Sequence, residues 1–473
     1  MKKALTIFSA AAILIALLLG CAQTPVAEKP PETTDAPAID YAINGVALGE
    51  YAIVYSDDDT DYARRAAAYI RDAIKTRTGL ELPLQEDDRV TADYEIVVGN
   101  TQREISALLE TPADPNCFAY LSAGNQVAME GEYFLIAAAA YYFVQTYIPE
   151  GFFDSRIPAE TTVCQPITEK PNRYILLIGD GMGVNHTKLY ENPPLQLQQL
   201  TGLSDGEDVF YGYLLPNQGF ARTDSLSGVT DSAAAGTALA TGYKTYNDRL
   251  GLDGNGKPVR NLTEIANYLG KSTAVMSTEV RTGATPSAFL VHIPNRNQTE
   301  AILQAQKNIE KIGVQIVCGF DVYQPEQIEP QIEDAVLGVL AQLEQDPEGF
   351  FFVYEEAYID KHSHNNDICW AFLALSRFNQ VIGRVMEYAY YHPDTFVLIT
   401  ADHETGGLTP DENGTMQYHT GNHTGADVPV FAWGQGSELF NGQTVENTQI
   451  PKTIARMWGM EDFGDPNTEP ALG

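Results

Sequence analysis

The segment around Ser232 places a hydroxyl group beside the carboxylate of Asp231, at the start of an alanine-rich stretch that predicts a helix. The first backbone N–H groups of a helix have no partner within it, so a phosphate held over Ser232 would meet hydrogen-bond donors and a favourable dipole. A serine is a poor nucleophile near neutral pH and needs a base or a metal ion to activate it. By itself, the segment is more typical of a capped surface helix with Asp231 in its first turn.

Acidic and imidazole side chains recur beside short apolar runs that are typical of buried strands. The runs cover residues 173–178, 350–354, 395–400 and 428–433. The side chains next to them are Asp180, Glu355, Asp402, His403 and His423. In open α/β sheets, ligands bind at the carboxyl ends of the strands, so we expect these side chains to lie close together.

Asp360 and His364 are four positions apart and would share one face if their segment is helical. Oxygen and nitrogen ligands of this kind suit zinc and magnesium. Each piece also has an ordinary interpretation, because a single Asp after a strand is usually a turn or a helix cap. We assign the other histidines to structural roles: His186, His292, His362, His392 and His419.

Taken together, the order and spacing of these segments resemble the alkaline phosphatase family. The resemblance runs from about Asn172 to the C-terminus and rests on five separated segments that match in the same order. It implies hydrolysis of phosphate monoesters through a phosphorylated serine, with Ser232 as the nucleophile. It also implies that Arg296 holds the substrate phosphate, because a planar guanidinium can bind two phosphate oxygens at once.

The resemblance further implies two zinc ions and one magnesium ion. The ligands of one zinc would be Asp360, His364 and His423. Those of the second zinc would be Asp180, Asp402, His403 and Ser232. The magnesium site would be formed by Thr285, Glu355 and the shared Asp180. One departure concerns this third site, since Gly283 stands where family members carry Asp or His. Lys361 directly follows Asp360 and would add positive charge near the phosphate.

Two alternatives remain open. One is a relative in the same superfamily that acts on phosphodiesters or sulfate esters, and Thr285 with Glu355 argues against it because a magnesium site marks the monoesterase branch. The other is a catalytically inert surface lipoprotein that binds glycans or phosphate. The presence of every expected zinc ligand argues against this second alternative, although Gly283 leaves an opening.

The sequence predicts an α/β fold with a central, mostly parallel sheet flanked by helices. Predicted helices in the catalytic domain, residues 171–473, include 298–311, 328–343 and 367–390. Residues 40–167 form a smaller predicted α/β domain, with a helix over 61–76 and a hairpin of 118–121 with 126–129. It resembles the small α/β domains that precede catalytic domains in some glycoside hydrolases. We interpret it as a spacer or packing module, with glycan binding as the alternative.

The first residues predict export. A basic start is followed by a short apolar core, and Leu17 to Cys21 resembles a bacterial lipobox. Residues 1–21 would thus be a lipoprotein signal peptide, with Cys21 lipidated and the protein anchored to the bacterial membrane on its extracytoplasmic side. The alternative is an ordinary secretory signal with an incidental cysteine. Residues 22–39 are rich in Pro, Thr and Ala, which is typical of a flexible linker.

The composition also limits the function. The chain has 63 acidic and 29 basic residues, for a formal net charge of −34. A nucleic-acid-binding protein needs a basic surface to displace counterions, so no nucleic acid binding is expected. The expected partners are small phosphate monoesters and, through Cys21, the membrane. The sequence leaves the oligomeric state open, and it permits a Cys117–Cys164 disulfide without requiring one.

Overall fold

The computed structural model describes residues 41–465, apart from 57–60, 90, 110–111, 113, 115, 165, 192, 194–208 and 320–330. The predicted signal peptide with Cys21, the predicted linker over 22–39 and the first residues of the helix predicted over 328–343 therefore lie outside the described residues. None of the helices in the described part of the chain combines the length and the apolar character that crossing a membrane requires.

The largest sheet in the described residues lies at the centre of the predicted catalytic domain. Its strands, in spatial order, are β13 (Gln315–Cys318), β12 (Ser272–Ser277), β14 (Phe350–Glu356), β10 (Arg173–Gly179), β15 (Thr395–Thr400), β20 (Val428–Trp433), β11 (Asn217–Arg222) and β21 (Thr444–Glu446). The pairs from β13 to β15 are parallel, whereas β20 runs antiparallel to β15 and to β11. The prediction of a mostly parallel sheet is thus confirmed.

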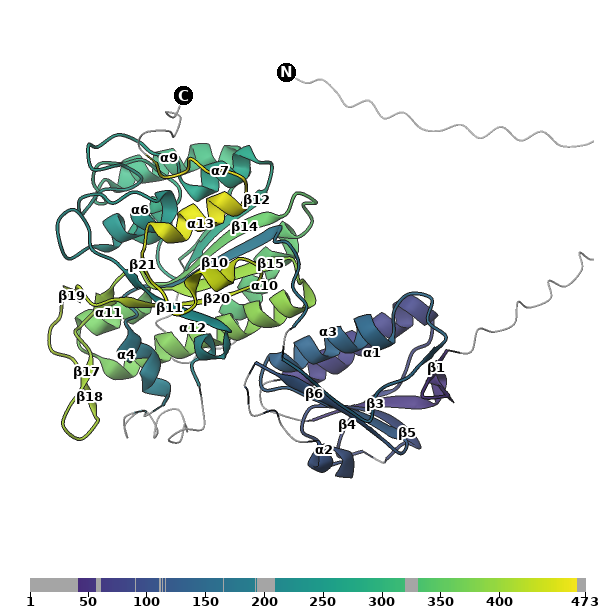
Figure 1. Cartoon of the computed structure of the whole chain (residues 1–473). Helices are drawn as coiled ribbons and strands as arrows, with labels where there is room; N and C mark the ends of the chain where they lie inside the picture. The colour runs from purple at the N-terminus through teal and green to yellow at the C-terminus, as the bar shows by residue number, and fades with distance from the viewer. Residues whose placement is uncertain are drawn as a thin grey trace, which may run out of the picture. The chain divides into compact units, whose positions relative to one another are not determined.

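Helices cover both faces of this sheet, as Figure 1 shows. Those on one side are α6 (Ser232–Thr241), α7 (Leu262–Tyr268), α9 (Thr299–Lys311) and α13 (Gln449–Met457). Those on the other side are α10 (Gln331–Leu343), α11 (Tyr358–His364) and α12 (Ile368–Tyr391). The short helix α8 (Ala284–Ala288) packs against α6. The helices predicted over 298–311 and 367–390 are confirmed as α9 and α12.

The central strands are buried on both faces because they are almost wholly apolar. Phe350, Phe351 and Phe352 of β14 are all fully buried. The register pairs Ile178 of β10 with Glu355 of β14 and with Thr400 of β15. Because these strands are parallel and in register, their carboxyl ends meet at one edge of the sheet, where the polar residues that follow them are brought together.

The N-terminal part has a sheet of its own. Its strands, in spatial order, are β4 (Leu84–Glu86), β3 (Tyr51–Tyr55), β5 (Tyr94–Val98), β7 (Gln126–Glu130), β6 (Phe118–Ala123) and β9 (Glu160–Val163). Strands β6 and β7 form the predicted hairpin. The helices that accompany this sheet are α1 (Tyr62–Thr78) and α3 (Leu135–Tyr147). A disulfide joins Cys117, before β6, to Cys164, after β9.

Contacts between α1 and α12 link the N-terminal sheet to the larger one. Arg65 pairs with the buried Glu387 at 2.8 Å, and the ring of Tyr69 stacks on that of Tyr391 with 4.3 Å between the centroids. Residues from Tyr41 onward form one compact unit. The division into domains at 40–167 and 171–473 stays a prediction.

The remaining elements are short. The strands are β1 (Ala42–Ile43), β2 (Val46–Ala47), β8 (Asp154–Ser155), β16 (Glu404–Thr405), β17 (Thr409–Pro410), β18 (Met416–Gln417) and β19 (His423–Thr424). The helices are α2 (Glu104–Leu108), α4 (Val184–Thr187) and the 3-10 turns η1 (Leu48–Glu50), η2 (Lys188–Tyr190), η3 (Tyr211–Leu214) and η5 (Ser437–Phe440).

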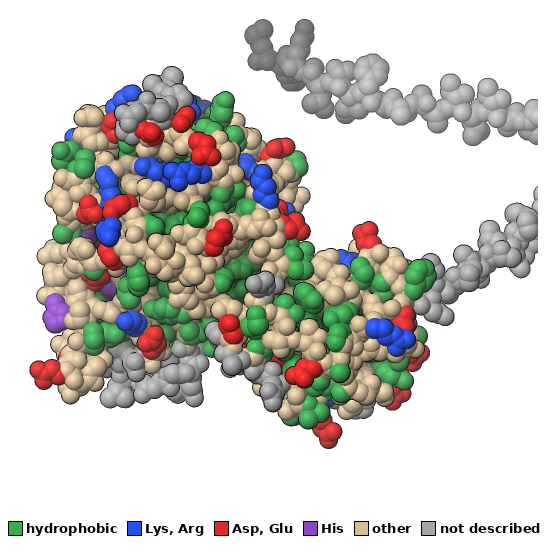
Figure 2. All heavy atoms as spheres, viewed as in Figure 1, with side chains coloured by type: hydrophobic (Ala, Val, Ile, Leu, Met, Phe, Trp, Pro, Cys, Tyr) green, Lys and Arg blue, Asp and Glu red, His purple; other side chains and the backbone are tan. Residues whose placement is uncertain are grey.

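Charged side chains of both signs are scattered over the face of the molecule drawn in Figure 2. On the face drawn in Figure 2, the coloured basic side chains occur in small groups beside acidic ones, and they form no continuous basic stripe.

Candidate metal and phosphate site

Ser232 is the first residue of α6, at the carboxyl edge of the large sheet. Asp231 is the N-cap residue, and its carboxylate accepts a hydrogen bond from the backbone N–H of Ala234 at 2.9 Å. Every residue of α6 is buried, including Ser232. The alternative of a capped surface helix is therefore wrong in two respects, because the helix is internal and Asp231 precedes its first turn.

A first cluster of possible metal ligands consists of Asp360, His364 and His423. The Nε2 atom of His364 lies 3.3 Å from Asp360 Oδ2 and 3.1 Å from His423 Nε2. The Nε2 atom of His423 lies 3.6 Å from Asp360 Oδ1. Backbone carbonyls of Gly421 and Thr230 contact the Nδ1 atoms of the two rings, which leaves both Nε2 atoms facing the carboxylate.

A second cluster consists of Asp180, Asp402 and His403, all of them buried. The Nε2 atom of His403 lies 3.5 Å from Asp180 Oδ1 and 3.2 Å from Asp402 Oδ2. It also lies 3.2 Å from the Oγ atom of Ser232. The hydroxyl of α6 is therefore in direct contact with the second cluster.

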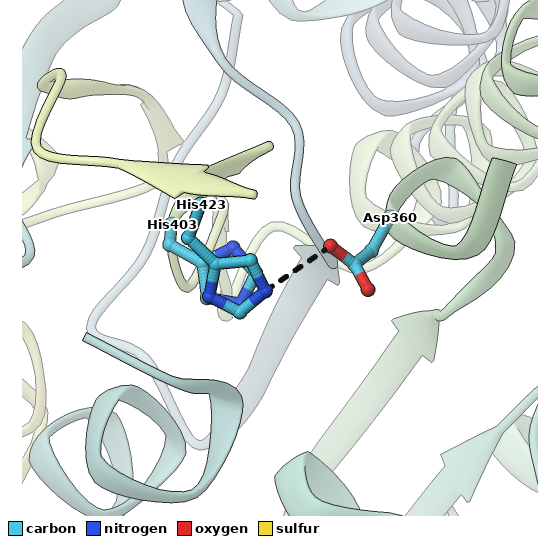
Figure 3. Close-up of side chains that lie close together, drawn as sticks. All are labelled: Asp360, His403 and His423. Carbon is cyan, nitrogen blue, oxygen red and sulfur yellow. Dashed lines mark ion pairs between the residues drawn. The ribbon is translucent and has the colours of Figure 1, made fainter. Parts of the chain in front are cut away.

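The two clusters adjoin each other. The rings of His403 and His423 stack with their centroids 3.6 Å apart, and Asp360 faces them, as Figure 3 shows. Ligand atoms of Asp360, His403 and His423 all lie within 4.8 Å of one another, as do those of Asp180, Asp402 and His403. Two cations bound here would be neighbours, with Ser232 beside them.

Gly181 makes this proximity sterically feasible. Its φ is +73°, and a Cβ atom on it would lie 2.8 Å from the Cα atom of Asp360. Any larger residue would push the first cluster away from the second.

The predicted third-site residues, Thr285 and Glu355, are buried at the same edge. Four buried side-chain oxygens here have no hydrogen-bond partner in the described part of the chain. They belong to Asp180, Thr285, Glu355 and Asp402. Buried polar atoms almost always make a hydrogen bond, and a bound ion is one of the few explanations for several neighbouring atoms that make none. The donor set thus fits bound cations, with imidazoles at the first two clusters and oxygens alone at the third.

The electrostatics are those of carboxylates crowded together in a buried site. Burial raises the pKa of Glu355 to about 8, and the carboxylate of Glu279 adds to the shift. Burial together with the charge of Asp360 raises the pKa of Asp402 to about 7. The pKa of Asp180 is raised well above its usual value by burial and by the charge of Asp402. Such groups are costly to ionise without a cation, and a cation removes that cost.

The histidines complete this pattern. Burial and the neighbouring ring of His423 lower the pKa of His403, so that imidazole is neutral and free to bind a metal. Burial opposes ionisation of Asp360, but the hydrogen bond from His364 and the charges of the nearby rings hold the pKa of Asp360 well below its usual value.

Arg296 lies beside the start of α6. Its Nη1 atom donates to Asp231 Oδ2 at 3.2 Å, and its backbone N–H donates to the carbonyl of Asp248 at 2.7 Å. Asp231 Oδ2 also accepts from the backbone N–H of Asp248, at 3.0 Å. The carboxylate of Asp231 therefore caps α6 and also holds the guanidinium of Arg296 beside the N-terminus of that helix.

The structure also shows neighbours that the sequence pattern leaves out. The hydroxyl of Thr405 donates to Asp360 and lies 3.2 Å from His403 Nδ1, so that it joins the two clusters. Lys361 pairs with Glu279 at 2.5 Å. The position of Thr405, just after Asp402 and His403, is the signal that would have found it. Of the histidines given structural roles, His186 is buried and contacts Gly183 and Ser363.

The arrangement is an α/β sheet edge at which a buried serine lies beside two clusters that could hold metal ions, and sequence comparison gives the family. The profile of the alkaline phosphatase family matches residues 172–322 and 316–421, which together make up more than half of the chain. Alkaline phosphatase 4 of Bacillus subtilis strain 168 is 29% identical over 347 residues, which cover 60% of this chain and 70% of that protein. Alkaline phosphatase 3 of the same strain is 25% identical over 411 residues, covering 59% and 87%.

Solved structures agree on the fold. The alkaline phosphatase of the Antarctic bacterium TAB5 aligns with a TM-score of 0.54 at 24% identity, over 63% of this chain and 99% of that chain. The cold-active alkaline phosphatase of Shewanella sp. aligns with a TM-score of 0.54 at 26% identity, over 61% and 99%. The chain belongs to the alkaline phosphatase family.

Proposed function

We propose that the protein hydrolyses phosphate monoesters through a phosphoserine intermediate at Ser232. The observation that carries this proposal is the position of the Ser232 hydroxyl, at the N-terminus of the buried helix α6 and 3.2 Å from His403 Nε2, beside both clusters. The hydroxyl is thus placed where a phosphoryl group would meet helix amides, a guanidinium and bound cations at once.

The residues of the chain divide the reaction between them. The Oγ atom of Ser232 loses its proton and forms a bond to phosphorus while the bond to the ester oxygen breaks, and that oxygen takes up a proton as the alcohol leaves. Arg296 and the first amides of α6 hold the oxygens that do not react, and Asp231 keeps the guanidinium in place. Water then attacks the phosphoserine, phosphate leaves, and the hydroxyl of Ser232 is restored. Positioning and charge stabilisation carry most of the catalysis in phosphoryl transfer.

We propose that the cofactors are two zinc ions and one magnesium ion. One zinc would be held by Asp360, His364 and His423. The other would be held by Asp180, Asp402, His403 and Ser232. Magnesium would be held by Thr285, Glu355 and the shared Asp180. When bound, the zinc ions would lower the pKa of the attacking hydroxyl and neutralise charge on the entering and leaving oxygens.

The choice of monoesters over diesters or sulfate esters rests on the third site. Thr285 and Glu355 lie buried beside the second cluster with unsatisfied oxygens, as a third cation requires. The test is a comparison of 4-nitrophenyl phosphate, bis(4-nitrophenyl) phosphate and 4-nitrophenyl sulfate as substrates of the purified protein with zinc and magnesium. We expect the monoester to give the highest kcat/KM. A higher value for the diester or the sulfate would move the assignment to another branch, and no turnover would leave an inert binding protein.

We also propose that Cys21 anchors the protein on the extracytoplasmic side of the bacterial membrane. The Cys117–Cys164 disulfide supports export, because disulfides persist in oxidising compartments. In cells, the parent protein should sediment with membranes and a Cys21→Ser variant should not. Equal membrane association of the two would show that Cys21 is not the anchor.

A further inference from the structure

Gly283 lies just before α8, the helix that carries the predicted third-site residue Thr285, and the structure shows what fills the space where a side chain at 283 would lie. Gly283 precedes α8, with an ordinary backbone φ of −53° that any residue can adopt. A Cβ atom built on Gly283 would lie only 1.7 Å from Oε1 of Glu279 and 2.3 Å from its carboxyl carbon. The carboxylate of Glu279 therefore occupies the volume into which a side chain at 283 would extend.

Glu279 is linked through Ser277 to the third-site residue Glu355, and its side chain is held by Lys361. Its backbone N–H donates to the hydroxyl of Ser277 at 3.1 Å, and that hydroxyl donates to Glu355 Oε2 at 2.5 Å. On its other side, Oε2 of Glu279 pairs with Lys361 Nζ at 2.5 Å, next to Asp360 in the chain. The Glu279 side chain is 14% exposed, which is far less than a surface carboxylate.

The cation site itself is indicated by atoms other than Glu279. Thr285 Oγ1 and Glu355 Oε1 are buried and have no hydrogen-bond partner in the described part of the chain, and the same is true of Asp180 Oδ1. These are all hard oxygen donors, which suit magnesium better than zinc. Lys361 neutralises the charge of Glu279 only, so the negative charges of Asp180 and Glu355 would still be stabilised by a bound cation.

From this geometry we infer that Glu279 supplies, from a different position in the chain, the carboxylate that Gly283 cannot, and that it completes the third cation site as a magnesium-positioning residue. Its oxygen Oε1 lies where a side chain at 283 would extend, while Oε2 is paired with Lys361. Gly283 is then required by Glu279, because a side chain at 283 and the carboxylate of Glu279 exclude each other. The inference rests on the proposed function in one respect, because the third cation site is part of that proposal.

Magnesium binding to the purified, zinc-loaded full-length protein tests this inference by isothermal titration calorimetry. Glu279→Gln keeps the shape and removes the charge, and we expect the affinity for magnesium to fall roughly 10–100-fold, as is usual when a residue that supports a metal site is changed. The zinc content of the same protein should stay unchanged. Glu310→Gln is the matched control, because Glu310 pairs with Arg281 on the exposed side of α9.

A double variant tests directly whether a carboxylate at position 283 can replace the one at position 279. Glu279→Ala should bind magnesium weakly, and adding Gly283→Asp should restore most of the lost affinity, since the space is then free. Magnesium affinity unchanged in Glu279→Gln, or a double variant that binds no better than Glu279→Ala, would overturn the inference. So would a parent protein that binds no third cation. These readouts are binding constants, so a parent that binds magnesium but hydrolyses no monoester would contradict the proposed function alone.

Discussion

At the residue scale, the site is built from groups that each have a second contact to hold them. Arg296 is held by Asp231, His423 by the carbonyl of Thr230, and His364 by that of Gly421. Such supports fix the direction of each side chain before a ligand arrives, which lowers the cost of binding and reaction.

Arg296→Lys tests the guanidinium. Lysine keeps the charge but cannot hold two oxygens in one plane, so we expect kcat/KM for 4-nitrophenyl phosphate to fall roughly 10–100-fold, equivalent to about 1.5–3 kcal/mol for a charged hydrogen bond. Arg222→Lys is the control, because Arg222 is an exposed residue that pairs with Glu446. Equal activity of Arg296→Lys and the parent would remove Arg296 from the phosphate site.

The raised pKa values predict how the metal-free protein responds to pH. Glu355 and Asp402 have pKa values of about 8 and about 7 in the folded protein, above those of exposed carboxyls. Their contribution to stability is therefore fully present only below the pKa of an unfolded carboxyl, about 4, and is lost as the pH rises from there to the folded pKa values of about 7 and about 8. Chelated protein should melt several degrees lower at pH 9 than at pH 6.5, and zinc and magnesium should raise the melting temperature most at pH 9.

The variant Glu355→Gln distinguishes the ionisation of Glu355 from repulsion among the many other acidic groups as the cause of the stability loss at high pH. Without an ionisable group at 355, the chelated variant should lose less stability between pH 6.5 and 9 than the chelated parent. The melting temperatures would be measured by differential scanning fluorimetry. An equal fall in melting temperature between pH 6.5 and 9 in both proteins would show that ionisation of Glu355 does not control the loss of stability.

At the scale of elements, the close contact between α6 and α8 positions both Ser232 and Thr285. A Cβ atom on Gly236 of α6 would lie 3.2 Å from the Cα atom of Thr285 and 3.1 Å from the Cβ atom of Ala288. The glycine lets the two buried helices approach, so the nucleophile and the third site keep a fixed separation.

Gly236→Ala should therefore lower the melting temperature and weaken magnesium binding, although alanine is the better helix former. Gly338→Ala in α10 is the control, because its Cβ would meet nothing within 4 Å. That control should gain about 0.5–1 kcal/mol from its higher helix propensity. A gain in stability of similar size at both positions would mean that the α6–α8 contact tolerates a side chain.

Some elements could be predicted from the sequence and others could not. The strands β10, β14 and β15 contain continuous apolar runs with an acidic residue at or just beyond their carboxyl ends, so local pattern was enough to place Asp180, Glu355 and Asp402. Strand β11 contains Gly219 and polar residues and lies next to the edge strand β21, so its pattern is weak. The pairing of Glu279 with Lys361 depends on side chains from two elements meeting in space, which spacing alone does not encode.

At the scale of the whole molecule, a disulfide stabilises the N-terminal sheet. Cys117 and Cys164 are 47 positions apart and join the ends of β6 and β9, which pair with each other. The sequence permitted this bridge, but its two cysteines become neighbours only through the antiparallel pairing of distant strands.

Replacing both cysteines by alanine should cost about 2–4 kcal/mol of stability, the usual contribution of a disulfide. The loss should appear as a lower melting temperature of the oxidised protein, with kcat for 4-nitrophenyl phosphate unchanged, because the bridge lies outside the large sheet. A fall in kcat of the double variant at a temperature where it is fully folded would show that the N-terminal part acts on the site.

The most direct test of the central claim is to trap the phosphoryl group on the protein. The zinc- and magnesium-loaded protein would be mixed with 4-nitrophenyl phosphate, quenched in acid, digested and mapped by mass spectrometry, beside a Ser232→Ala variant. We predict one phosphoryl group on Ser232 of the parent and none on the variant, whose turnover is abolished. Monoester turnover without phosphorylation of Ser232, or turnover that persists in Ser232→Ala, would contradict the proposed mechanism.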